Sequence, residues 1–158
     1  MTLPTTSAHR LILKDYKSII NASKRFATEP KLAETTQIID IDEEKDEEID
    51  DTKTENKFRA ITTILKDCSK HRKLEAFRWH TCRDDSSTRP AEFWEALTRL
   101  APILQHLSFN FYTHELHRMK ETGISVTEWF LNRYSRVLLL VPNTSLSFRL
   151  TFLRHFLS

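Results

Sequence analysis

Two apolar segments of the chain share one pattern of residues at a spacing of 30. The aligned pairs are Leu74 with Leu104, Phe77 with Leu107, and Trp79 with Phe109. Both segments are short, and they are rich in aromatic residues or alternate between apolar and polar residues, as β-strands typically do. Each follows a stretch with helical periodicity. A helix, a tight turn and a strand that recur at this period indicate an α/β fold. The specific expectation is a short leucine-rich-repeat-like solenoid of alternating helices and parallel strands.

The same patterns extend along the 158 residues, which we expect to form a single domain, 1–158. Apolar spacing predicts the following helices: Ala8 to Phe26, Phe58 to Cys68, Ala91 to Leu100 and Val126 to Tyr134. Strands are predicted over these stretches: Thr35 to Ile41, Leu74 to Trp79, Leu104 to Phe111 and Val137 to Val141. The strand at Val137 would belong to a third repeat unit. A loop or short helix is expected over Thr113 to Glu121, ending at Gly123.

Proline residues and the final stretch refine these boundaries. Thr28-Glu29-Pro30 is expected to end the first helix, because the residue before proline disfavours helical backbone. Pro90 is expected to start a helix after a polar loop over residues 80–90.

The last stretch, SLSFRLTFLRHFLS, alternates as a strand does. Because an exposed strand of this kind would aggregate, we expect the fold or a partner to cover it, unless it marks an unnatural domain end.

Charge is distributed unevenly along the chain. Residues 40–51 contain nine acids and one Lys, a charge of −8, whereas the whole chain carries +2. These carboxylates repel one another and leave only Ile41 and Ile49 for burial. The sequence therefore predicts an acidic, flexible insert at about 40–56, either a solubilising loop or a docking site for a basic partner.

Composition excludes several classes of protein. The single glycine, Gly123, excludes the glycine-rich phosphate loops and nucleophile elbows of many enzymes. Mean hydropathy is −0.48 and no apolar run is long enough for a membrane helix, and the N-terminus does not resemble a secretory signal. Two cysteines, Cys68 and Cys82, in a chain of this length favour a reducing compartment, cytoplasmic or nuclear.

Two constellations could hold zinc. Cys68, His71, His80 and Cys82 have the right ligand types, but the second pair is tightly spaced and a core strand is predicted between the two pairs. His114 and His117 are three apart, whereas a zinc-protease helix needs four, the position of Arg118. We therefore expect no catalytic, cofactor-binding or metal residues. A zinc-stabilised small domain stays as an alternative.

The basic clusters could instead contact nucleic acid. They cover Lys70 to Lys73 and Arg10 to Lys24, with Phe77 and Trp79 nearby. The aromatic residues, however, stand at core spacing, and a solvated helix face explains the basic residues equally well. Trp79, Trp94 and Trp129 are accordingly expected in the core. A tryptophan exposed on the sheet would be a binding hot-spot candidate.

A family resemblance adds an expectation about function. The runs ILKDCSKHRKLEAFRWH, PAEFWEAL, LAPILQHLSF and FYTHELH resemble leucine-rich-repeat regions of fungal F-box-like proteins, over roughly residues 10–120. The resemblance implies that these residues pack rather than catalyse. It implies a non-enzymatic protein-protein interaction module whose partner is a protein, such as a ubiquitin-ligase client or component. Leu3-Pro4 is present, but the residues after it do not complete an F-box.

Overall fold

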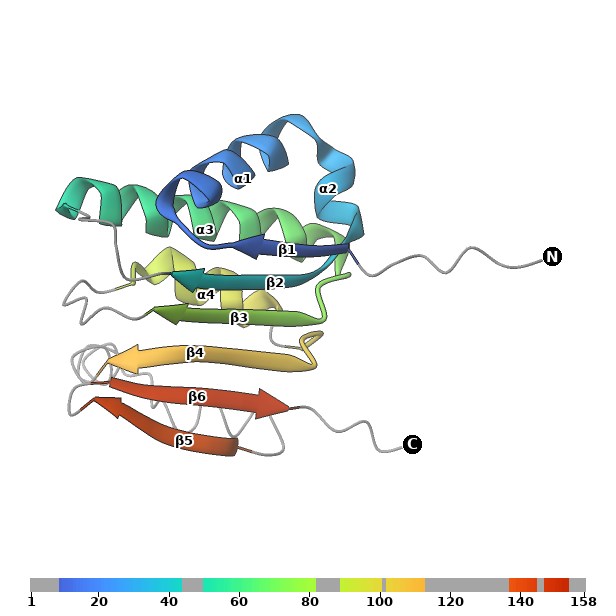
Figure 1. Ribbon diagram of the computed structural model, residues 1–158. Coiled ribbons are helices and arrows are strands. Elements are labelled where there is room, and N and C mark those ends of the chain that lie inside the picture. The colour runs from blue at the N-terminus through green and yellow to red at the C-terminus, as the bar shows by residue number, and fades with distance from the viewer. Residues whose placement is uncertain are drawn as a thin grey trace, which may run out of the picture.

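The computed structural model describes residues 9–43, 50–81, 89–100, 102–112, 137–144 and 147–153 (Figure 1). Six strands in these ranges form one sheet in the order β1-β2-β3-β4-β6-β5. The elements follow the chain in this order: β1 His9–Leu13, α1 Tyr16–Thr28, α2 Pro30–Thr35, β2 Thr36–Glu43, α3 Asp51–His71, β3 Ala76–Thr81, α4 Ala91–Leu100, β4 His106–Tyr112, β5 Val137–Thr144 and β6 Ser147–Leu153.

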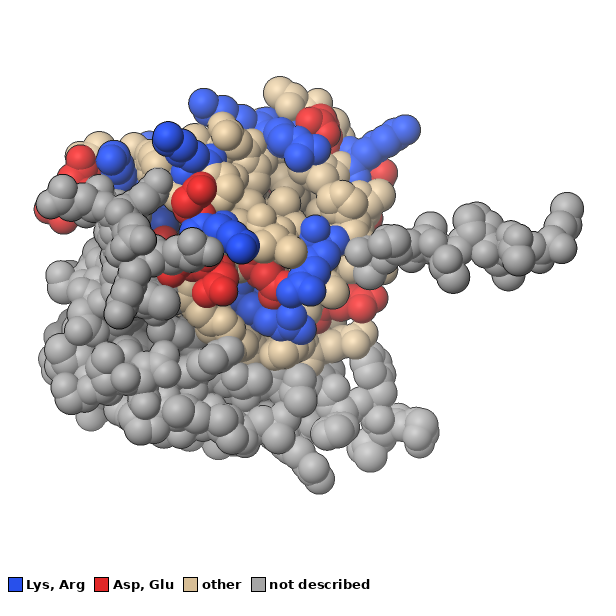
Figure 2. Space-filling view, in the orientation of Figure 1, with Lys and Arg blue, Asp and Glu red and all other residues tan. Residues whose placement is uncertain are grey.

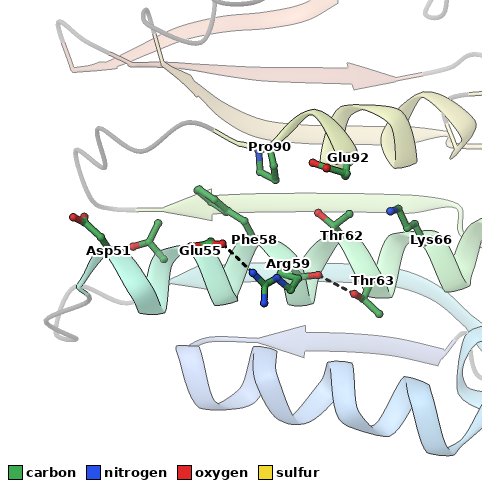
Figure 3. A pocket seen from close by; sticks show the side chains of 10 residues that line it. Asp51, Glu55, Phe58, Arg59, Thr62, Thr63, Lys66, Pro90 and Glu92 are labelled. Atoms are coloured by element: carbon green, nitrogen blue, oxygen red, sulfur yellow. Dashed lines mark hydrogen bonds and ion pairs between the residues drawn. The ribbon is translucent and has the colours of Figure 1, made fainter.

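The first four strands are parallel neighbours in sequence order, and helices connect them. Right-handed crossovers that always advance in one direction place every connecting helix on the same face of the sheet. Accordingly α3 lies between α1 and α4 behind the strands (Figures 1 and 3). The other face of β1–β3 is turned toward the viewer in Figure 2. The predicted α/β fold with alternating helices and parallel strands is confirmed for these four strands.

The spacing of 30 is the register of β3 against β4. Phe77 pairs with Leu107 and Trp79 with Phe109. Leu74 and Leu104 precede these strands and are both buried. The backbone carbonyl of Glu75 accepts hydrogen bonds from the N–H groups of Gln105, which precedes β4, and of His106, which begins it. The repeated pattern therefore exists because equivalent residues lie side by side in the sheet.

The prediction of one helix from Ala8 to Phe26 is wrong in its first part. His9–Leu13 forms the edge strand β1, and the helix α1 begins only at Tyr16. Its start is fixed by Asp15, whose carboxylate accepts from the Ser18 N–H at 2.6 Å while the Ser18 hydroxyl accepts from the Asp15 N–H at 3.1 Å. This reciprocal cap satisfies backbone donors that the helix leaves free. The predicted end at Thr28 is confirmed, and Pro30 opens α2.

The acidic segment is not one loop. Residues 40–43 belong to β2, and Asp40 and Glu43 are more than nine-tenths buried. Asp50 caps α3 by accepting from the Lys53 N–H at 2.8 Å, and residues 51–56 lie in that helix. The prediction of a flexible insert over 40–56 is therefore wrong at both ends, because ion pairs and a helix cap compensate these carboxylates. Residues 44–49 lie outside the described part of the chain.

The last two strands do not extend the parallel series. β6 is antiparallel both to β4 and to β5, which forms the sheet edge, so the predicted third repeat unit is wrong. The strand predicted to end at Val141 continues through Pro142 to Thr144, since proline is tolerated in an edge strand. β6 is hydrogen-bonded on both sides. The expectation that the fold covers this alternating stretch is thus confirmed for the backbone of Ser147–Leu153.

Other predicted segments fall outside the described residues. These are the loop or short helix over 113–121 with Gly123, the helix over 126–134 with Trp129, and residues 82–88 of the polar loop. The first two residues of that loop, His80 and Thr81, belong instead to β3.

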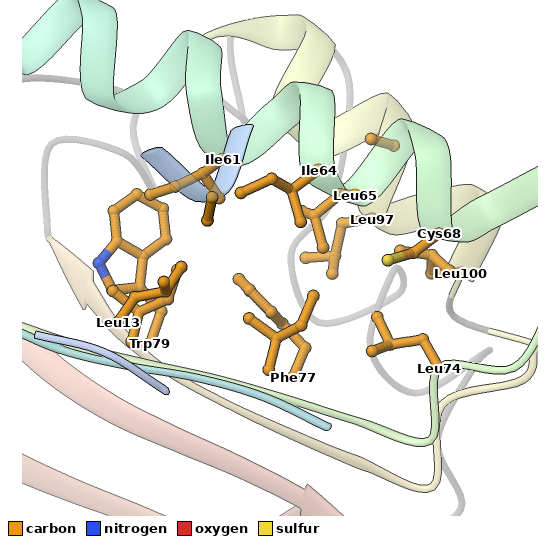
Figure 4. Packing of buried hydrophobic residues seen from close by; sticks show 14 of the residues in the cluster. Leu13, Ile61, Ile64, Leu65, Cys68, Leu74, Phe77, Trp79, Leu97 and Leu100 are labelled. Carbon is orange, nitrogen blue, oxygen red and sulfur yellow. The ribbon is translucent and has the colours of Figure 1, made fainter. Parts of the chain in front are cut away.

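The core lies between the helices and one face of the sheet (Figure 4). Ile61, Ile64, Leu65 and Cys68 of α3 face Phe77 and Trp79 of β3, and all are at most 1% exposed. Burying one such large side chain contributes roughly 1.5–3 kcal/mol. The Trp79 and Phe93 rings meet edge to face, with centroids 5.6 Å apart. Trp79 thus lies in the core, as predicted, whereas Trp94 is partly buried and packs against the core.

Candidate functional site

The helix-free face of the sheet carries the polar side chains of β1–β4. Side chains alternate between the faces of a strand, so the buried Ile39, Ile41 and Trp79 direct their neighbours to the other side. We define the helix-free face by these residues: Arg10, Ile12, Ile38, Asp40, Ala76, Arg78, His80, His106 and Ser108. Figure 2 shows acidic side chains between basic ones over β1–β3.

Asp40 joins three strands through two arginines. Its Oδ2 accepts from Arg10 Nε, and its Oδ1 accepts from Arg78 Nη1 at 3.2 Å. The Asp40 side chain is 11% exposed, whereas the Arg10 and Arg78 side chains are 53% and 31% exposed. One largely buried carboxylate therefore holds two guanidinium groups whose outer parts reach solvent.

Histidines extend this network to β4. Arg78 Nε and Nη2 lie 3.3 and 3.1 Å from His106 Nδ1. Because a guanidinium has no acceptor, His106 Nδ1 must accept the hydrogen bond. His80 Nε2 lies 2.9 Å from Ser108 Oγ, again between β3 and β4. Neighbouring strands are thus linked by side chains as well as by their backbones.

A second charged cluster is buried where β2 and β3 end. Glu43 accepts from Lys57 Nζ at 2.8 Å and from Trp79 Nε1 at 2.9 Å. The Arg89 guanidinium carbon lies 4.6 Å above the centre of the Trp79 ring. Glu43, Lys57 and Arg89 are only 7%, 2% and 4% exposed. With so little access to solvent, this cluster ties α3 and residue 89 to the sheet and acts as an internal anchor.

A groove of about 500 Å³ lies between α3 and α4 (Figure 3). Its lining consists of Asp51, Thr54, Glu55, Phe58, Arg59, Thr62, Thr63 and Lys66 of α3, with Pro90 and Glu92 at the start of α4. Within it Arg59 Nη2 donates to Glu55 Oε1 at 2.9 Å, and both side chains are about 70% exposed. An exposed pair of this kind contributes little stability. Acidic and basic side chains both line the groove, and Phe58 is its one aromatic lining residue. The lining residues do not form a cluster of catalytic side chains.

The residues considered for zinc are not brought together. Cys68 is buried between α3 and the sheet, where burial raises the pKa of its thiol to about 12. His80 lies on the opposite face of β3, bonded to Ser108. Cys82, His114 and His117 lie outside the described residues. Across the described ranges, no three His, Cys, Asp or Glu side chains form a group that could hold a metal ion.

Four of the residues considered for nucleic acid are engaged within the protein. Phe77 and Trp79 are 0% and 1% exposed, so neither ring can stack on a base. Lys70 Nζ donates to Asp67 Oδ1 at 2.7 Å, and Arg10 is paired with Asp40. One residue of each basic cluster, Lys70 and Arg10, therefore lies beside a carboxylate of the same chain.

Sequence reasoning missed the network around Asp40. The predicted acidic insert includes Asp40, and the sequence patterns single out neither Arg78 nor His106. A signal was present, because all three stand at the polar positions of predicted strands. Opposite charges at such positions on neighbouring strands favour contact.

None of the described helices combines the length and apolar character needed to cross a lipid bilayer. The fold and the site together define an α/β protein with its described helices on one face of the sheet and a charged network on the other. Comparison of the chain with family models, with curated proteins and with solved structures finds no match.

Proposed function

We propose that the protein is a non-enzymatic protein-interaction module, and that β1–β4 with their helices form a short leucine-rich-repeat-like solenoid. The sequential order of the parallel strands, the helices on one face and the spacing of 30 support this proposal. It agrees with the resemblance to the repeat regions of F-box-like proteins. The partner is a protein, such as a ubiquitin-ligase client, received by the helix-free face.

The observation that carries the proposal is the network of Arg10, Asp40, Arg78 and His106 on that face. Arginine is common among residues that dominate binding energy at interfaces. Asp40 holds both guanidinium groups before any partner arrives, so less side-chain entropy is lost on binding. The groove between α3 and α4, by contrast, lies on the helix side, away from these charges.

Site-specific photo-crosslinking tests this proposal. A photoreactive residue at Ile38, which is half-buried on the helix-free face, is compared with one at the exposed Glu55 of α3. We expect the probe at position 38 to crosslink a distinct protein from an extract of the native cells, and the probe at position 55 to crosslink none. The adduct should disappear when Arg78→Ala is added, because the network then loses its central cation.

Two results would contradict the proposal. One is equal crosslinking from positions 38 and 55, which would indicate nonspecific contact. The other is an adduct that forms only from position 55, which would move the binding surface to the helices. Circular dichroism of each variant controls for loss of the fold.

A further inference from the structure

A hollow of about 330 Å³ lies between α1 and α3. Its lining includes Ile20, Ser23 and Lys24 of α1 with Asn56, Arg59 and Ala60 of α3. We call it the α1–α3 hollow. In Figure 3, α1 and α4 lie on opposite sides of α3, so the hollow and the groove beside α4 flank the same helix. Its volume is at the lower end of the range for small-molecule sites, about 300–1,000 Å³.

The α1–α3 hollow differs in charge from the groove between α3 and α4. Three carboxylates line that groove, whereas none lines the hollow, whose charged residues are Lys24 and Arg59. The helix α1 contains no acidic residue from Tyr16 to Thr28. Glu55 lines the groove and accepts from Arg59 Nη2. Two cations and one neighbouring carboxylate therefore leave a net positive charge at the hollow.

Several polar groups of the hollow are not used by the protein itself. Across the described ranges, the side chains of Ser23, Lys24 and Asn56 form no hydrogen bond or ion pair. Ser23 and Asn56 are half-buried. Arg59 uses Nη2 for Glu55, so its Nε and Nη1 remain as donors. Donors beside an uncompensated positive charge favour an anion, because charge-assisted hydrogen bonds are the stronger ones.

Part of the lining is apolar. Ile20 is partly buried and packs against the core, and Ala60 is 6% exposed. A hydrocarbon group in contact with Ile20 would remove apolar surface from water, which favours association. A bare inorganic ion lacks this contact. The lining therefore suits an anion that also carries an apolar part.

From these features we propose that the α1–α3 hollow binds a small organic monoanion, a carboxylate with an apolar body. Lys24 and Arg59 hold the carboxylate by charge. Ser23 and Asn56 donate to it, and the apolar body lies on Ile20. A phosphate monoester, which is close to a dianion at neutral pH, would bring more negative charge than this lining compensates. The site belongs to the helix layer and is separate from the helix-free face that the proposed function assigns to a protein partner.

Nuclear magnetic resonance titration of the isotope-labelled full chain tests the inference. The probes are phenylbutyrate and hexanoate, which share a carboxylate and differ in their apolar bodies. Both should shift the backbone amide resonances of Asn56 and Ala60 in a saturable way. Acetate, which lacks the apolar body, should bind at least about tenfold more weakly. The neutral amide of phenylbutyrate should bind up to about fivefold more weakly, because it loses the ion pairs.

Variants locate the contact. Asn56→Asp places a carboxylate in the hollow with little change in side-chain size and should weaken phenylbutyrate binding about tenfold or more. Lys24→Gln should weaken it up to about fivefold and reduce its dependence on salt. Lys66→Gln is the matched control, because Lys66 lies on the same helix and lines the groove but not the hollow. It should leave the affinity unchanged, and circular dichroism of each variant controls for the fold.

Each contrary outcome overturns the inference. Acetate or inorganic phosphate that binds as tightly as phenylbutyrate would indicate an adventitious ion only. Equal binding of the neutral amide, or unchanged affinity in Asn56→Asp, would show that charge does not select the ligand. Shifts confined to Thr54 and Glu92 would move the ligand to the groove beside α4.

Two further results would also contradict it. One is the absence of a saturable shift with both phenylbutyrate and hexanoate. The other is displacement of phenylbutyrate by a single-stranded oligonucleotide with a steep dependence on salt, which would assign these cations to nucleic acid. Neither result bears on crosslinking from Ile38, so the proposed interaction module is tested separately.

Discussion

The two faces of the same strands are held by different forces. On the helix side Ile39, Phe77 and Trp79 are at most 1% exposed, and removal of apolar surface from water stabilises them. On the helix-free side the largely buried Asp40 holds Arg10 and Arg78 by charge, and both arginines keep contact with solvent. Arg78 and Trp79 are adjacent in sequence yet belong to opposite faces. Adjacent residues of a strand therefore serve different purposes: one stabilises the core, and the next forms the charged surface.

The most direct test of this difference compares two single variants, one of a core residue and one of its neighbour on the other face. Trp79→Ala should lower the free energy of unfolding by about 4 kcal/mol, because it leaves a cavity, and it also deprives Glu43 of a donor. Arg78→Ala is the matched control on the other face and should cost about 1 kcal/mol or less. Urea denaturation measures both changes. Similar losses for the two variants would show that the faces are not energetically distinct.

The buried pair of Lys57 and Glu43 is a charged exception on the helix side. Lys57→Met leaves the Glu43 carboxylate buried without its cation and should cost about 3 kcal/mol. Adding Glu43→Gln should recover part of that loss, because it removes the unpaired charge while its amide oxygen still accepts from Trp79 Nε1. Denaturation of the wild type, the single variant and the double variant completes the measurement. A double variant less stable than Lys57→Met alone would show that the Glu43 carboxylate stabilises the fold even without Lys57, and would contradict this expectation.

Much of this arrangement could be predicted from sequence where the pattern was local. The spacing of 30 gave the register of β3 and β4 because stacked units repeat the same residues. The start of α1 was missed, although Asp15 and Ser18 form a capping pair, because Leu11 and Ile12 fit helical spacing as well as they fit β1. The antiparallel placement of β6 depends on pairing between distant segments, which no local pattern encodes.

The charged network was missed for a related reason. A count of the acids in residues 40–51 treats them as one group, although alternate residues of a strand lie on opposite faces of the sheet. Asp40 points to the helix-free face, whereas Glu43, three residues later, reaches Lys57 in the core. Alternation along the predicted strand would have separated these two carboxylates. Their partners Arg78 and Lys57, however, are known only from the register and from the packing of α3.

The helix-free face can be probed through Asp40. Asp40→Asn removes the charge between two arginines and should cost about 1 kcal/mol, a small amount because Arg10 is half exposed. Asp42→Asn, on the exposed residue two positions later, is the control and should cost less. The difference between the variants should shrink in high salt, which screens exposed charges. A loss that is large and independent of salt would place Asp40 with the buried anchors instead.

Cys68 provides the smallest test, on the helix side. Burial is the main cause that raises its thiol pKa from 9.0 to about 12, with a smaller contribution from the Asp67 charge. The folded protein therefore holds this proton more tightly than the unfolded chain does, so the associated stability is complete below pH 9 and is lost as pH rises toward 12. At pH 9.5 wild type should lose less than about 1 kcal/mol relative to Cys68→Ala, each compared with its own value at pH 7. Urea denaturation at the two pH values measures this difference, and since other groups titrate equally in both proteins, the comparison isolates Cys68.

In a Cys82→Ser background a thiol reagent should modify Cys68 only at the rate of unfolding, because the folded core shields the thiol. Rapid modification of the folded protein would show that the core at α3 is open to solvent.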